Sequence, residues 1–97
     1  MWTVVFSGRA RKGIKKLPDK VSASLKLLVK DLQLSGPLLK QWPNFGEIIG
    51  RPGCYHCHLK KGRPTFVAVW QVKYRDIKLI EVRYVGTLEG ADYGRIC

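Results

Sequence analysis

Two histidines stand two positions apart near the middle of this 97-residue chain, at His56 and His58. Histidine titrates near neutral pH, so each side chain can take up or give off a proton there. Attack of a ribose 2′-hydroxyl on its own phosphate needs a base, an acid for the leaving oxygen and positive charge around the phosphate. The pair therefore has the side chains for the two proton transfers of RNA cleavage.

Other side chains that suit this chemistry lie on both sides of the histidines. Glu81 and Arg83 could support catalysis, and Tyr93 could stack on a base. Phosphate contacts are expected from a basic set: Lys60, Lys61, Arg63 and Arg51. Each residue also has an ordinary interpretation, namely a solvated strand face, a weak surface ion pair or an aromatic packed on the core.

The cysteines invite a metal interpretation, because Cys54 and Cys57 form half of a common zinc motif. On a strand these two side chains point to opposite faces, and the chain has no second ligand pair. We therefore expect neither a metal site nor a redox pair, and no cofactor. With Cys97 the cysteines form an odd set without an even disulfide framework, which is typical of a reducing compartment.

Charge is the most unusual property of the composition. The chain has 18 Lys and Arg against 7 Asp and Glu, giving a formal net charge of +11 and a pI near 10.0. Small domains usually carry a net charge of magnitude about 2–8. Such an excess attracts polyanions, with RNA the first choice, and it also suits an acidic protein partner.

Length and hydropathy limit the organisation of the chain. Its 97 residues suit one domain spanning 1–97. The N-terminal apolar run is too short for a signal peptide, and no later segment reaches membrane-spanning length. We therefore expect a cytoplasmic protein without membrane contact.

The N-terminal half predicts a strand followed by two helices. Residues 4–6 suggest the strand, and a first helix is expected from Ser7 and Gly8 to Leu17. Pro18 suits the first position of a second helix, which Gly36 ends. Its apolar residues recur at helical spacing and would form one stripe: Val21, Leu25, Leu28, Val29 and Leu32. Two helices with almost no loop between them predict an antiparallel hairpin.

After an extended connection over 38–53, the pattern changes to strands at 54–60, 65–74 and 77–85. Short links between them predict an antiparallel meander, whereas the tail over 86–97 shows no decisive pattern. The expected fold class is α+β, with the N-terminal strand and helical hairpin packed on one face of an antiparallel three- to four-stranded sheet.

Alternation along the strands assigns side chains to the two faces of the sheet. The inward set is predicted to be Tyr55, Cys57, Leu59, Ile80, Val82 and Tyr84. The outward set is predicted to be Cys54, His56, His58, Lys60, Leu79, Glu81, Arg83 and Val85. For the middle strand, over 65–74, alternation does not decide which of its two sides faces the core. Because the helices cover only one face, the other would be open and would carry both histidines.

The order of strand, two helices and meander resembles that of the RelE/ParE toxin superfamily, and most closely its RelE-type branch. The resemblance rests on GCYHCHLKKG at 53–62, VWQV at 69–72 and KLIEVRYVGT at 78–87, and it covers nearly the whole chain. It implies a toxin of a bacterial toxin–antitoxin pair that cuts mRNA in the ribosomal A site and is silenced by an acidic antitoxin.

The resemblance also implies site residues. RelE-type toxins place basic side chains on the strand that matches 54–60, where this chain has His56, His58 and Lys60, and Tyr93 matches their C-terminal aromatic. The chain departs from the pattern at Leu88 and Val67, positions that are often basic in relatives. Compensation would fall to two other basic residues, Arg63 or Arg83.

The leading hypothesis is a metal-independent, ribosome-dependent mRNA endoribonuclease that inhibits translation. Its partners would be mRNA on the ribosome, with contacts to rRNA, and an acidic antitoxin in a small hetero-oligomer. The antitoxin would lay a partly disordered helix or strand across the basic surface. Two alternatives stay open: a ParE-like inhibitor of DNA gyrase without nuclease activity, and a degenerate, non-catalytic module that binds antitoxin or nucleic acid.

Overall fold

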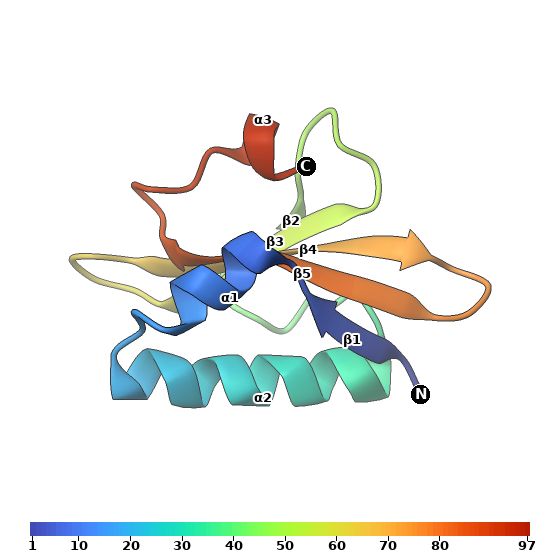
Figure 1. Cartoon of the computed structure of the whole chain (residues 1–97), viewed down its shortest axis with the longest axis horizontal. Coiled ribbons are helices and arrows are strands. Elements are labelled where there is room, and N and C mark those ends of the chain that lie inside the picture. The colour runs from blue at the N-terminus through green and yellow to red at the C-terminus, as the bar shows by residue number, and fades with distance from the viewer.

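The computed structural model describes all residues 1–97 as one five-stranded sheet with helices on both faces (Figure 1). The elements in chain order are β1 (Thr3–Phe6), α1 (Gly8–Ile14), α2 (Asp19–Ser35), β2 (Gly46–Glu47), β3 (Cys54–Lys60), β4 (Phe66–Tyr74), β5 (Leu79–Thr87) and α3 (Tyr93–Ile96). The sheet order is β1-β5-β4-β3-β2. The α+β prediction is confirmed, but the sheet has five strands instead of three to four and is not wholly antiparallel. β1 joins its edge in parallel with β5 and does not pack on its face, and two residues of the connection pair with β3 as β2.

The helical hairpin forms where the sequence predicts it. Ser7 caps α1, since its hydroxyl accepts a hydrogen bond from the Ala10 amide at 3.1 Å. The same hydroxyl donates to the Arg83 carbonyl at 3.0 Å, which ties the start of α1 to β5. Pro18 is the N-cap of α2 rather than its first helical residue. Gly36 ends α2 with a φ of 86°, a conformation that favours glycine.

The main core lies between α2 and the face of the sheet that carries Tyr55, Cys57 and Trp70. Trp70 is fully buried, and its indole Nε1 donates to the Pro37 carbonyl at 3.1 Å. The predicted inward residues of β3 are confirmed. The middle strand, which alternation could not rank, turns Ala68 and Trp70 toward the helices.

A bulge in β5 overturns two of the predicted assignments. Val69 pairs with Tyr84 while Trp70 pairs with Val82, so Arg83 is an extra residue in β5. An extra residue reverses the alternation beyond it. Val85 therefore packs into the main core, whereas Tyr84 packs against the small cluster on the opposite face.

The face expected to be open is partly covered by the C-terminal tail. α3 lies across the sheet from α2 (Figure 1), and Ile96 is buried there in a small cluster with Ile48, Cys54 and Val69. The expectation of unpaired cysteines is wrong, because Cys54 and Cys97 form a disulfide that fastens the tail to β3. Cys57 is free and lies in the main core on the opposite face, as alternation predicts.

None of the helices is long and apolar enough to cross a membrane.

Candidate functional site

β3 presents both histidines on the face that α2 does not cover. His56 lies opposite Val69 of β4 on one side and Gly46 of β2 on the other, and His58 lies opposite Val67. A Cβ atom added to Gly46 would lie 3.5 Å from His56 Nε2, so the imidazole leans over the short edge strand. That distance is an ordinary van der Waals contact, so the ring packs closely against the backbone of this strand.

Both imidazoles have an unused buried nitrogen. Nδ1 of His56 and Nδ1 of His58 are buried without a hydrogen-bond partner. Burial lowers the pKa of His56, and the neighbouring His58 lowers it further. Burial also lowers the pKa of His58, with a second contribution from the charge of Lys61. Both rings therefore favour the neutral form that can accept a proton, and protonating one opposes protonation of the other.

These shifts predict that acid weakens the fold. A histidine with a lowered folded-state pKa binds fewer protons than its unfolded form, whose pKa is 6.5. The free energy of unfolding should therefore be fully retained above pH 6.5 and should fall as the pH drops from 6.5 through the lowered pKa values. Urea denaturation at a series of pH values measures this slope.

The matched control for that slope is the variant His56→Gln with His58→Gln, which removes both titrating groups but keeps polar side chains. Its free energy of unfolding should vary less with pH between 5 and 7 than that of the parent chain. Equal slopes in the two proteins would show that other groups cause the acid sensitivity.

Tyr93 completes the surroundings of His56. Its ring stacks on the imidazole with centroids 5.4 Å apart and planes 25° apart. Burial raises the pKa of Tyr93, and Tyr84 and Cys57 add to the rise, so the phenol stays neutral. A groove of about 350 Å³ opens beside this pair, lined also by Glu47, Ile48 and Ile49. The structure thus places Tyr93 against His56, although the two residues are far apart in the sequence, and His58 lies two positions from His56 on the same strand.

Glu81 and Arg83 are placed elsewhere. Arg83 Nη1 donates to Glu81 Oε1 at 2.6 Å, and Arg83 Nε donates to the Ile96 carbonyl at 2.6 Å. Both residues lie on β5, which is two strand spacings, or about 10 Å, from β3. The guanidinium therefore holds the tail in place here and does not reach the histidines.

The four expected phosphate contacts are all exposed and surround the histidines unevenly. Lys60 ends β3, and Lys61 lies close enough for its charge to act on His58. Arg63 is in the following loop. Arg51 lies beside α3, since a Cβ atom added to Gly94 would be 4.0 Å from Arg51 Nη2. Both ends of the histidine strand thus have a positive side chain nearby.

The two departures from the RelE-type pattern supply no charge. Val67 is fully buried opposite His58, and Leu88 is 38% exposed just beyond β5. No group of three or more His, Cys, Asp or Glu side chains is arranged to hold a metal ion.

Sequence analysis missed the part played by Tyr84. The bulge at Arg83 turns this ring to the same face as Tyr93, where its hydroxyl donates to the Thr87 carbonyl at 2.8 Å. It missed the position of the tail as well. Ile96 was the available signal, as the one large aliphatic side chain among the last nine residues.

Comparison with known proteins finds similarity only in three dimensions. No protein-family profile matches the chain, and no curated protein matches its sequence. The isolated RelE toxin of E. coli has a TM-score of 0.70 and 24% identity, covering 98% of this chain and 93% of its own. A mutant of that toxin in the free state has a TM-score of 0.72 and 24% identity, covering 93% of this chain and 86% of its own.

A RelBE2 toxin–antitoxin complex from Mycobacterium tuberculosis gives a TM-score of 0.63 and 19% identity, covering 89% of this chain and 96% of its own. All three likenesses extend over most of both chains. The α+β sheet, the helical hairpin and the small C-terminal helix together therefore have the fold of the RelE toxins.

Proposed function

We propose that this chain is the toxin of a toxin–antitoxin pair and that it cuts mRNA on the ribosome. The observation that carries the proposal is the histidine pair, with two buried Nδ1 atoms that lack partners, set among exposed cations on a RelE fold. The similar solved proteins are described as toxins, and one of them as a toxin–antitoxin complex. We also infer that residues 1–97 act as one domain.

The proposed reaction moves two protons. One neutral histidine takes the proton of the ribose 2′-hydroxyl, whose oxygen bonds to phosphorus as the bond to the 5′-oxygen breaks. The other histidine gives its proton to that leaving oxygen. The products are a 2′,3′-cyclic phosphate and a 5′-hydroxyl. The substrate phosphate raises the pKa of the nearer imidazole, which supplies the protonated acid that the free protein disfavours.

Other residues hold the substrate in this scheme. Lys60 and Lys61 place positive charge near the phosphate, and Arg51 and Arg63 contact the backbone on either side. Tyr93 offers its ring to a base. Arg83 is expected to reach the phosphate only after it releases the Ile96 carbonyl, and Glu81 orients it until then.

The partners follow from charge. A chain of +11 suits mRNA and rRNA on the ribosome, and an acidic antitoxin would bind it in a small hetero-oligomer. Action on ribosomes would place the protein in the cytoplasm. No step of the proposed reaction requires a cofactor.

The test is a purified translation reaction programmed with a labelled message. The protein should cut the message only when ribosomes are present, and protein synthesis should stop. Unimpaired synthesis at a large molar excess of the protein would end the proposal. DNA supercoiling by gyrase, assayed in parallel, would fall instead if the chain were a gyrase inhibitor.

A further inference from the structure

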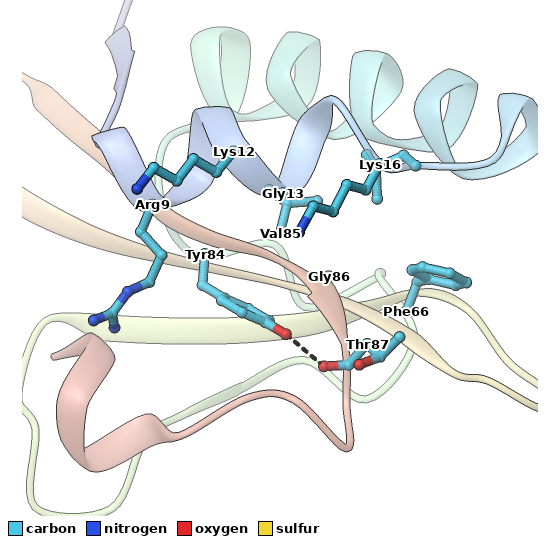
Figure 2. Close-up of a pocket in the computed structure, with 10 residues that line it drawn as sticks. Arg9, Lys12, Gly13, Lys16, Phe66, Tyr84, Val85, Gly86 and Thr87 are labelled. Atoms are coloured by element: carbon cyan, nitrogen blue, oxygen red, sulfur yellow. Dashed lines mark hydrogen bonds between the residues drawn. The ribbon is translucent and has the colours of Figure 1, made fainter.

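A groove between α1 and the end of β5 is rich in unpaired cations. Its volume is about 410 Å³, and Figure 2 shows α1 side chains above residues 84–87 of β5. The lining includes Arg9, Lys12, Lys16, Phe66, Tyr84 and Thr87. None of these residues has a role in the proposed cleavage.

The cations are spaced to face the groove together. Arg9, Lys12 and Lys16 lie at positions i, i+3 and i+7, which share one side of a helix and its continuation. All three are exposed, and none of their side chains forms an ion pair or a hydrogen bond within the chain. No carboxylate lines the groove. Three uncompensated charges therefore face one hollow.

Tight packing fixes this side of α1 against the sheet. Gly13 approaches β5 so closely that a Cβ atom there would overlap the carbonyl of Val85. The groove floor is equally fixed, because Tyr84 donates its hydroxyl to the Thr87 carbonyl at 2.8 Å (Figure 2). The cations thus extend from a rigid base.

Aromatic rings accompany the charges. Tyr84 lies beside the Arg9 side chain, and the ring of Phe66 lies toward the Lys16 side of the groove (Figure 2). Cations that follow a backbone, combined with rings on which bases stack, are the features of a single-strand binding surface. A double helix would not present its bases to these rings.

The groove continues toward the C-terminal tail. A second hollow of about 350 Å³ shares Arg9 and Tyr84 with it and adds tail residues that include Ile96 and the ion pair of Arg95 with Asp92. Tyr84 packs against the same small cluster as Tyr93, which stacks on His56. The two hollows therefore lead from α1 across Tyr84 to the C-terminal tail, whose Tyr93 contacts His56.

We propose that the α1–β5 groove binds backbone phosphates of single-stranded RNA that extends beyond the bond held at His56 and His58. The RNA-binding part stands on the groove itself, and the continuation to the cut bond rests on the proposed function. Lys12 and Lys16 contact phosphates, Arg9 guides the strand toward the tail, and Phe66 stacks on a base.

The test compares two variants of equal net charge. Lys12→Ala with Lys16→Ala removes two groove cations, whereas Lys26→Ala with Lys30→Ala removes two exposed cations from α2. Affinity for a short single-stranded RNA oligonucleotide is measured over a range of KCl concentrations. The groove variant should lower the slope of log K against log[salt] by about 1.4, which is roughly 0.7 for each lost phosphate contact. The α2 variant should keep the slope of the parent chain.

A third variant tests stacking separately. Phe66→Leu keeps an apolar side chain and should weaken binding of the single strand by roughly 5-fold or more, without changing the salt slope. Its affinity for an RNA duplex of the same sequence should not change.

The inference is overturned if the groove variant keeps the salt slope of the parent chain, or if the groove variant and the α2 variant lower that slope by the same amount. The latter result would mean diffuse attraction by net charge. Message cleavage by the parent chain, measured as above, separates the two proposals. If the parent chain cuts message but the groove variant keeps the parent salt slope, only the groove inference is wrong. If the groove variant lowers the salt slope but the parent chain cuts no message, only the proposed nuclease activity is wrong.

Discussion

His56→Ala combined with His58→Ala is expected to abolish growth arrest and to slow message cleavage at least about 100-fold, because each positioned proton transfer typically contributes 10²–10⁴-fold. Both side chains are partly exposed on β3 and their Nδ1 atoms have no partner in the chain, so removing them breaks no internal hydrogen bond. The cleavage rate in the translation reaction and growth after induced expression measure the effect.

The matched control for the histidine pair is Thr3→Ala with Val5→Ala. These residues also stand two apart on a strand and are exposed, but they lie on β1 at the far edge of the sheet. The control should cut message at the parent rate. If the histidine variant folds and still arrests growth while supercoiling falls, the nuclease assignment is wrong and gyrase becomes the target.

Gly13→Ala is expected to destabilise the fold by about 3 kcal/mol or more, at the upper end of overpacking effects. The added Cβ would overlap the carbonyl oxygen of Val85, and both groups belong to backbone that is fixed by a helix and a strand. Neither can move without separating α1 from β5. The free energy of unfolding from urea denaturation measures the loss.

Gly8→Ala is the control on the same helix. A Cβ atom at Gly8 would meet nothing within 4 Å, and alanine favours helix by up to about 1 kcal/mol. This variant should be as stable as the parent or slightly more so. Equal denaturation midpoints for the two glycine variants would mean that α1 is not held against Val85 in solution.

The sequence contained most of the architecture because burial imposes periodicity. The α2 stripe of Val21, Leu25, Leu28 and Leu32 is buried as its spacing predicts. Alternation in β3 also placed Cys57 in the core and both histidines on the other face. These patterns are local, so they can be read without knowing the partner elements.

The errors arose where long-range pairing decides the outcome. The bulge at Arg83 depends on how β4 and β5 align, and no local pattern marks it. The Cys54–Cys97 disulfide joins residues 43 positions apart. The tail over 86–97 has too few apolar residues to show a helical or strand periodicity. Its position on the sheet could therefore not be predicted, and neither could the contact of Tyr93 with His56.

The pairing of β1 with β5 sets the order in which the chain can fold. Thr3 pairs in parallel with Leu79, and β5 lies between β1 and β4 in the sheet. During synthesis the first strand has no partner until residues 79–87 have emerged, and pairing at such separation is slow. The groove beside α1 also needs β5 as its floor. A nascent chain therefore lacks both the complete sheet and the basic groove, so the candidate RNA surface arises only after nearly all of the residues described here have been made.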